Sequence, residues 1–220
     1  DKEYIIIDGE SSDDTLSIIK KYQNHIDILI SEKDNGIYDA INKGLKEAKG
    51  DIIGLLHSDD HYPNDNILSF VSQSFDKNNI DIVWGNVALI DENNNNKRFY
   101  SGKSIDVSSF DKGIMPPHPS VFIKKSCYQK FGNFNLNYKI SADYDLLLRF
   151  LKIENLKYLY NSKILVNMRL GGLSNSGIVS LYNINKEIYK IHKANMMPIS
   201  ILSLLKKLPL RIKELINKNG

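Results

Sequence analysis

The sequence predicts an α/β fold with a mostly parallel sheet, helices on both faces of that sheet and further helices at the C-terminal end. Short apolar segments alternate with amphipathic ones through the first half of the chain, an order typical of strands joined by helices. The composition, 42% hydrophobic and 25% charged among 220 residues, is that of an ordinary globular protein. We expect residues 1–175 to form the α/β domain and residues 176–220 a basic helical tail.

Four short apolar segments of the first half predict strands. The third contains IIGLL, which is apolar on both faces, as in a strand buried between two layers. The predicted strands are residues 3–7, 26–30, 51–57 and 80–87, with another at 164–170. Residues 91–96, DENNNN, are polar and predict the tip of a hairpin.

Helical signals lie between and after these strands. Residues 37–48 place apolar side chains at helical spacing, and Gly50 occupies the usual position after a helix end. Ser11, Ser12 and Asp13 are candidates for the N-cap of an earlier helix. Further helices are predicted at residues 67–75, 141–151 and 178–194. Residues 101–115 show little periodicity, and we expect a loop over the site there.

Carboxylates follow the ends of the first three predicted strands: Asp8, then Glu32 and Asp34, then Asp59 and Asp60. In open α/β sheets, ligands bind outside the carboxyl ends of the strands. Adjacent carboxylates repel each other and are costly to desolvate unless a cation or a donor is present. Mg²⁺ and Mn²⁺ prefer such oxygen ligands, so we expect one of these ions here. The alternative for any single loop is an ordinary solvated acidic turn.

Several other kinds of site lack their motifs. The sole cysteine, Cys127, lies in no C-x-x-C pattern, which argues against a zinc site and excludes a disulfide within the chain. The absence of G-x-x-x-x-G-K-[ST], G-x-G-x-x-G and G-x-S-x-G weighs against P-loop NTPases, dinucleotide dehydrogenases and serine hydrolases. No apolar stretch approaches the roughly 20 residues of a membrane span. We therefore expect a cytoplasmic protein.

Charge is unevenly distributed along the chain. Residues 186–220 hold eight Lys or Arg and two Glu, a net charge of +6, so the other residues carry −3 of the overall +3. An acidic body with a basic tail is not the pattern of a nucleic-acid-binding protein. From Ile199 to Leu215 the tail has an apolar stripe, interrupted at Pro209. Two interpretations stay open: a basic interfacial helix on a membrane, or a stripe that packs on the domain or a second subunit.

Four segments together resemble family 2 glycosyltransferases of the GT-A fold, a Rossmann-like fold for nucleotide-diphospho-sugars. They are IIIDGESSDDT (5–15), EKDNGIYDAINKGLKEAKGDIIGLLHSDD (32–60), HPSVF (118–122) and ISADYDLLLRF (140–150). The likeness runs from residue 3 to about residue 175, and is greatest to bacterial enzymes of capsule, O-antigen and exopolysaccharide assembly. The resemblance also implies one more strand and helix before the D-G-x-S motif, and we expect weakened nucleotide binding without them.

The resemblance implies roles for matching residues on the donor side. Asp8 would hydrogen-bond the nucleotide base, and Asp39 would help to shape the nucleotide pocket. Asp59 would approach the ribose, and Asp60 would ligate the Mn²⁺ or Mg²⁺ that bridges the diphosphate. Gly171 to Ser174 would fold over the diphosphate, with Arg169 as a charged neighbour.

On the acceptor side, Asp143 matches the catalytic base of the family, which takes a proton from the attacking hydroxyl. His118 would line the acceptor side, although a lone His between prolines is as often structural. Asp145 and Arg149 would support the helix of Asp143, and Tyr38 would stack or pack.

The implied protein is an inverting, metal-dependent transferase with a nucleotide-sugar donor, a UDP-sugar. Its acceptor would be a glycan or a lipid-linked molecule, and its C-terminal helices would contact the inner face of the plasma membrane. Two alternatives stay open: a non-catalytic relic that binds a nucleotide or glycan, and a nucleotidyltransferase.

Overall fold

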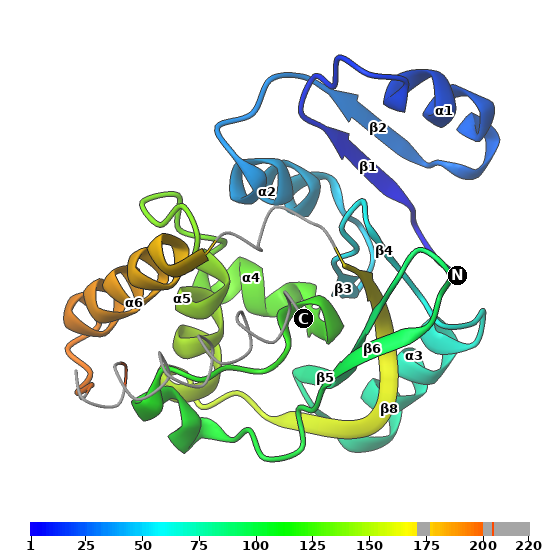
Figure 1. Cartoon of the computed structure of the whole chain (residues 1–220). Helices are drawn as coiled ribbons and strands as arrows, with labels where there is room; N and C mark the ends of the chain where they lie inside the picture. Colours follow the sequence, from blue (N-terminus) through cyan, green and yellow to red (C-terminus); the bar gives the residue numbers. More distant parts are fainter. Residues whose placement is uncertain (171–176, 200–203, 205–220) are drawn as a thin grey trace.

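The computed structural model describes residues 1–170, 177–199 and 204. Its strands and helices follow one another along the chain as β1 (Ile5–Asp8), α1 (Thr15–Lys21), β2 (Ile28–Ser31), α2 (Ile37–Glu47), β3 (Ile52–Gly54), β4 (Asp60–His61), α3 (Ile67–Asn78), β5 (Ile82–Ile90), β6 (Asn96–Tyr100), β7 (Val121–Lys124), α4 (Lys125–Phe131), α5 (Ala142–Leu148), β8 (Tyr158–Arg169) and α6 (Gly177–Ala194). Figure 1 shows β1, α1 and β2 as a small unit beside the main body.

The strands form two sheets instead of the single, mostly parallel sheet predicted. β1 and β2 pair in parallel as a two-stranded sheet. The second sheet has the order β3-β7-β5-β8-β4, with β6 on β5. Within the described residues, only β5 and β8 pair in parallel there, and the other pairs are antiparallel. The α/β class is confirmed, but the sheet is mixed, because β7 and β8 from the second half of the chain pair with strands of the first half.

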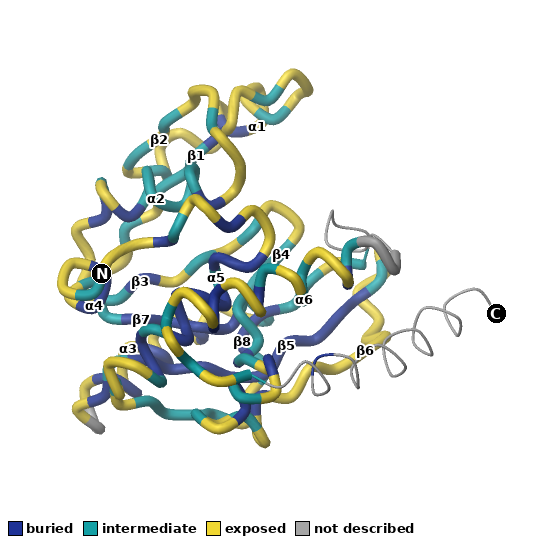
Figure 2. The backbone as a smooth tube through the Cα atoms, turned by 90° about the vertical axis from the view of Figure 1, so that its left-hand side faces the viewer, coloured by how far each residue is buried: buried dark blue, intermediate teal, exposed yellow. Residues whose placement is uncertain are grey.

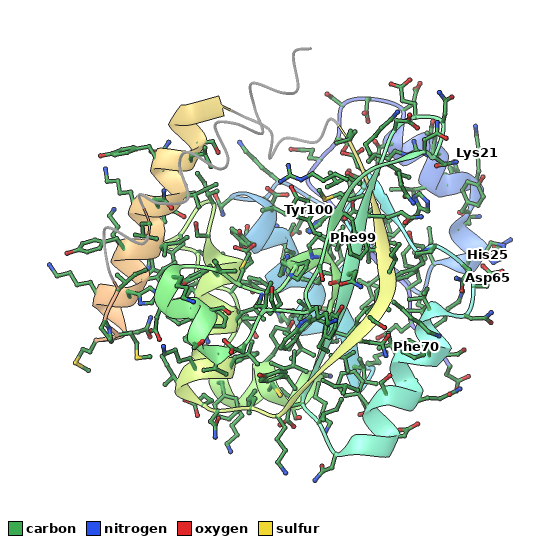
Figure 3. The ribbon with its side chains drawn as sticks, turned by 60° about the horizontal axis from the view of Figure 1, so that its bottom comes forward. Lys21, His25, Asp65, Phe70, Phe99 and Tyr100 are labelled. Atoms are coloured by element: carbon green, nitrogen blue, oxygen red, sulfur yellow. The ribbon has the colours of Figure 1, made fainter. Side chains whose placement is uncertain are left out.

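The core lies between the larger sheet and the helices that cover it. All nine residues of β5 are buried, and so are six of the seven residues of α5, as the dark segments of Figure 2 show. Apolar side chains on both faces explain why β5 sits at the centre of the sheet. By contrast, β6 is exposed along its length, with Phe99 and Tyr100 on it (Figure 3).

Several predicted elements differ in extent from the observed ones. The strand predicted at 51–57 ends at Gly54, and the chain then turns before the short strand β4. The segment 101–115 contains a 3₁₀ turn, Val107–Lys112, which Asp106 caps in a capping box with Ser109. Helix α5 continues into a π-helical turn over Arg149–Ile153. The hairpin predicted around 91–96 is confirmed by the pairing of β5 with β6.

Helix α2 links the two sheets. A Cβ atom on Gly44 would lie 3.3 Å from the side chain of Ile7 on β1, so glycine permits close packing there. From the same helix, Tyr38 and Leu45 join the core of the main body. α2 is amphipathic, as its apolar spacing predicted, but it packs against both units.

Helix α6 confirms the helix predicted at 178–194 and packs on the core beside α5 (Figure 1). Ile188 and Ile191 are buried in this contact. Ile199, the one residue of the predicted C-terminal stripe that is described, packs against the same cluster. The rest of the stripe and the loop of Gly171 to Ser174 lie outside the described residues.

Candidate functional site

The carboxylate of Asp143 lies in the first turn of α5 and is held from two sides. Its Oδ1 accepts hydrogen bonds from the Tyr144 backbone N–H at 2.8 Å and from the Tyr38 hydroxyl at 3.1 Å. Both of these bonds go to Oδ1, which leaves Oδ2 for a ligand. Burial raises the pKa of Asp143 to about 6, because a charged carboxylate loses its hydration there.

Tyr38 makes a second contact that defines the geometry around Asp143. Its hydroxyl also lies 2.7 Å from the carbonyl oxygen of Ile140. A tyrosine hydroxyl has a single proton to donate, so Ile140 and Asp143 compete for it. Burial, and then the negative charge of Asp143, raise the pKa of Tyr38 far above its ordinary value. Tyr38 therefore stays protonated and acts as a donor.

Aromatic rings surround this carboxylate. Phe134 stacks on Tyr38, with 5.6 Å between ring centroids, and lies edge-on to His118 at 5.9 Å. His118 in turn lies 6.1 Å from the ring of His57. Burial lowers the pKa of both histidines to about 4, so both rings are neutral near pH 7. The result is a weakly polar wall around an ionisable carboxyl group.

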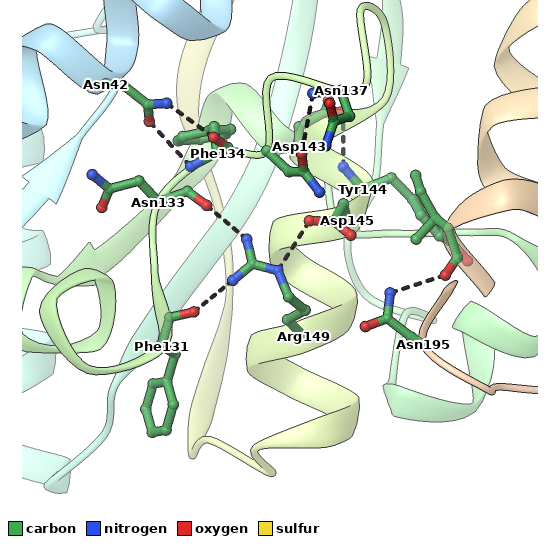
Figure 4. Close-up of polar contacts among 12 residues, drawn as sticks. Asn42, Phe131, Asn133, Phe134, Asn137, Asp143, Tyr144, Asp145, Arg149 and Asn195 are labelled. Carbon is green, nitrogen blue, oxygen red and sulfur yellow. Dashed lines mark hydrogen bonds and ion pairs between the residues drawn. The ribbon is translucent and has the colours of Figure 1, made fainter. Parts of the chain in front are cut away.

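Two polar side chains fix the segment that bears Phe134 (Figure 4). Asn42 on α2 donates to the Phe134 carbonyl at 2.9 Å and accepts from its N–H at 3.1 Å. Arg149 donates to the carbonyls of Phe131 and Asn133 and to the carboxylate of Asp145. The supporting role predicted for Asp145 and Arg149 agrees with these contacts, although they hold the 131–134 segment as well as α5.

The turn that contains Asp59 and Asp60 follows β3. The Asp60 N–H donates to the His57 carbonyl at 3.0 Å, and the Asp59 carbonyl accepts from the Arg169 N–H at 3.4 Å. Asp60 Oδ2 is buried and has no hydrogen-bond partner. Burial, and then the neighbouring charge of Asp59, raise the pKa of Asp60 to about 6. A buried, unpartnered carboxylate oxygen needs a cation or a donor.

That oxygen fits the Mn²⁺ or Mg²⁺ expected from the sequence. Among the described residues, no group of three or more His, Cys, Asp or Glu side chains forms a metal-binding cluster. Mg²⁺ is commonly bound by one or two carboxylates together with substrate phosphates and water. The arrangement around Asp60 is consistent with an ion that arrives with a diphosphate.

Asp8 lies at the end of β1 and is buried. Its Oδ2 accepts from the Ser31 hydroxyl at 2.7 Å and from the Ser11 N–H at 3.2 Å. Hydrogen bonds from Ser11, and then from Ser31, hold the pKa of Asp8 below its ordinary value. Asp8 is therefore ionised, and its carboxylate ties the ends of β1 and β2 together.

Asp39 lies in the first turn of α2 and turns toward the end of β2. It accepts hydrogen bonds from the backbone and side chain of Asn35 at 2.9 and 3.3 Å. Lys43 lies 3.9 Å from this carboxylate and 2.9 Å from that of Glu32. Asp34 also lies here: a Cβ atom on Gly9 would stand 2.3 Å from its carboxylate. A side chain at residue 9 would therefore displace the Asp34 carboxylate from this position.

The structure thus places the predicted residues in two groups. Asp143, His118 and the turn of Asp60 meet around His57, whereas Asp8 and Asp39 make their contacts at the two-stranded sheet. The sequence analysis did not single out His57, Phe134 or Asn42. His57 could have been suspected from its place directly before the Ser58-Asp59-Asp60 turn.

The sequence profile of Glycosyl transferase family 2 matches residues 1–144, and the chain belongs to this family. A PGL/p-HBAD biosynthesis glycosyltransferase of Mycobacterium bovis is 28% identical over 181 residues, which are 80% of this chain and 69% of that protein. An uncharacterised glycosyltransferase of Rickettsia prowazekii is also 28% identical over 181 residues, covering 76% of this chain and 54% of the relative.

Solved structures confirm the GT-A fold. Staphylococcus aureus TarS, in complex with UDP-GlcNAc, superimposes with a TM-score of 0.60 at 16% identity, covering 86% of this chain and 57% of TarS. A mannosyltransferase of Pyrobaculum calidifontis, in complex with GDP-Man and Mn²⁺, has a TM-score of 0.59 at 12% identity, with 88% and 55% covered. The chain spans just over half the length of these solved structures.

Proposed function

We propose that this protein is an inverting glycosyltransferase that moves a sugar from a nucleotide-diphosphate donor, a UDP-sugar, to a hydroxyl of a glycan or lipid-linked acceptor. The observation that supports it best is that two partly buried carboxylates, Asp143 and Asp60, both interact with His57. The carbonyl of His57 accepts from the Asp60 N–H, and the His57 ring lies within electrostatic range of Asp143. His57 thereby connects the proposed base to the turn that bears the proposed metal ligand.

Asp143 is the proposed general base. Its Oδ2 takes the proton of the acceptor hydroxyl while that oxygen attacks the anomeric carbon and the bond to the diphosphate breaks. A base works best when its pKa lies near the working pH, and burial raises the pKa of Asp143 to about 6. The Tyr144 N–H and the Tyr38 hydroxyl orient the carboxyl group through Oδ1. A single displacement implies inversion at the anomeric carbon.

The donor side is proposed around Asp60 and Asp59. Asp60 would hold Mn²⁺ or Mg²⁺, and Asp59 would approach the ribose. When bound, the ion would neutralise charge on the departing diphosphate. Asp8 would accept a hydrogen bond from the nucleotide base, since its ionised carboxylate still has acceptor capacity. Asp39 would shape the same pocket by holding the turn at Asn35.

A lipid-linked acceptor at an anionic membrane surface is supported by the outer face of α6. Lysines accompany two exposed tyrosines along this face: Tyr182, Lys186, Tyr189, Lys190 and Lys193. Tyrosines and lysines favour the interface of an anionic bilayer. No described helix is both long and apolar enough to cross a membrane. Sedimentation with phosphatidylglycerol vesicles, but not with phosphatidylcholine vesicles, is expected, and equal sedimentation with both would contradict electrostatic attachment.

The first test of the donor side is a calorimetric titration of UDP with Mn²⁺ and then with EDTA. Binding is expected with Mn²⁺, and Asp60→Ala should weaken it about tenfold or more through loss of a charged ligand. Incubation with UDP-sugars and acceptors should then release free UDP. Release of pyrophosphate would instead favour a nucleotidyltransferase, and UDP binding without any transfer would favour a non-catalytic relic.

A further inference from the structure

Glu187 on α6 makes an unusual set of contacts with the segment before Asp143. Its Oε1 accepts from the Lys139 N–H at 3.0 Å, and its Oε2 from the N–H groups of Ile140 and Ser141 at 3.0 and 2.8 Å. Three successive backbone donors thus converge on one carboxylate from a distant part of the chain. Hydrogen bonds to a charged acceptor are roughly twice as strong as neutral ones.

The segment depends on this carboxylate because it has no side-chain cap of its own. Ser141 occupies the N-cap position of α5, yet its side chain makes no capping hydrogen bond and its hydroxyl is buried without a partner. Serine is among the residues that normally supply this cap. Glu187 therefore does from α6 what Ser141 would ordinarily do locally.

The position of Glu187 is itself fixed by the packing of α6. Ile184, before Glu187, packs against the core, and Ile188 and Ile191, after it, are 4% and 0% exposed, so the helix is anchored on both sides of this residue. The Tyr144 hydroxyl lies 2.8 Å from His192 Nε2, which ties α5 to α6 one residue after Asp143. Glu187 is thus a rigid reference point for the start of α5.

The peptide group of Ile140 connects Glu187, through Tyr38, to the carboxylate of Asp143. Its N–H is held by Glu187 and its carbonyl lies 2.7 Å from the Tyr38 hydroxyl. The same hydroxyl lies 3.1 Å from Asp143 Oδ1. If the Ile140 carbonyl moves away, the proton of Tyr38 goes wholly to Asp143.

We propose that Glu187 is a positioning residue, which places Asp143 and sets its ionisation by holding the 139–141 backbone against Tyr38. This inference rests on the proposed role of Asp143 as the base. The ionisable groups that face Asp143 are Tyr38 from α2 and His57 from the segment after β3. Glu187 faces the backbone N–H groups and acts through them.

The test compares Glu187→Ala and Glu187→Gln with the wild type and with Asn183→Ala, an exposed residue on the same helix. In Glu187→Ala, kcat is expected to fall about 10- to 100-fold through misplacement of the base, with KM for the donor changed less than about threefold. Glu187→Gln can keep the two bonds to Oε2 and should lie between. Asn183→Ala should match the wild type.

A second readout separates positioning from simple stabilisation and does not require transfer. The pKa of the Asp143 carboxyl is measured by ¹³C NMR, with its signal assigned by Asp143→Asn. In Glu187→Ala the pKa should fall, because the Ile140 N–H loses its acceptor and Tyr38 then donates fully to the ionised carboxylate, and the acid limb of kcat should move to lower pH. Glu187→Gln removes the same charge but keeps the bond to Ile140, so its pKa should fall less.

The outcomes differ for the two proposals. A wild-type pKa of Asp143 together with a wild-type kcat per folded molecule, even at a lower melting temperature, would make Glu187 a stabilising cap only and overturn the inference. A shifted pKa in a protein that transfers no sugar would retain the positioning role and overturn the proposed base. If Glu187→Ala does not fold, Glu187→Gln alone decides.

Discussion

The two sheets of this protein differ sharply in how much they bury. Among residues 1–31, which contain β1, α1 and β2, only Asp8 and Ile19 are buried. In the main body, β5 alone buries nine consecutive residues. Leu16, Ile18, Tyr22 and Leu29 are exposed apolar side chains of the smaller unit. Within the described residues, β1 pairs with β2 alone and β3 with β7 alone.

This difference separates the two halves of the proposed chemistry. Asp143 lies in the first turn of α5 in the densely packed body, and the partly buried Asp60 starts β4, which pairs with β8 of the same body. Asp8 lies in the sparsely packed unit, where local opening costs little free energy. We infer that the reacting groups are organised in advance, whereas recognition of the nucleotide base is ordered when the donor binds.

The largest expected effect comes from replacing the proposed base, which lies in the main body. Asp143→Asn removes the proposed base and should lower kcat by about 10²- to 10⁴-fold. UDP affinity, measured by calorimetry with Mn²⁺, should stay within about twofold because the nucleotide contacts lie elsewhere. Wild-type turnover in this variant would remove Asp143 from the mechanism.

The next largest effect compares how much packing contributes to stability in the main body and in the smaller unit. Leu147 on α5 is 0% exposed and Leu16 on α1 is 38% exposed. Leu147→Ala should reduce the free energy of unfolding by about 2–5 kcal/mol, and Leu16→Ala by less than about 0.5 kcal/mol. Urea denaturation of both variants gives the values. Similar losses would mean that the smaller unit is packed as tightly as the body.

About half of this architecture could be read from the sequence. The alternation of apolar segments located β1, α1, β2, α2 and β5 in order, because each has its own period and boundary residues. It could not reveal the mixed sheet, since strand pairing depends on contacts between distant segments such as β5 and β8. Asp143 and Asp60 were found through motifs. Phe134 and Glu187 lie outside the motifs, and their contacts arise only from tertiary packing.

The pH dependence of transfer sharpens the assignment of the base. Only the ionised carboxylate can accept the proton, and burial raises the pKa of Asp143 to about 6. Measured at saturating Mn²⁺ and donor, where the bound ion keeps Asp60 ionised although its free pKa is also about 6, transfer should therefore be maximal above about pH 7 and fall about tenfold per pH unit below 6. Tyr38 stays protonated throughout, and His57 and His118, with pKa values lowered to about 4, add no limb in this range. A profile flat down to pH 5 would contradict the assignment.

The smallest effect is expected from a substitution in the less buried unit of β1, α1 and β2. Asp8→Asn leaves the base in place but loses the charge that holds Ser31 and Ser11. UDP affinity should fall about tenfold, the scale of one charged hydrogen bond, with kcat changed little. Asp27→Asn, an exposed residue of the same unit, serves as the control. A fall in kcat without a change in affinity would place Asp8 on the reacting side.

Helix α2 shows what this division means for altering the protein. Two neighbouring residues of its first turn contact different parts of the proposed site. Asp39 holds the turn at Asn35 on the nucleotide side, and the Tyr38 hydroxyl donates to Asp143 on the reacting side. Gly36, with φ of +114°, sets the direction in which this turn begins. With the roles proposed above, nucleotide affinity and reaction rate are therefore not expected to change independently at these positions. A laboratory search for variants that accept a new sugar would do better to leave residues 36–39 unchanged.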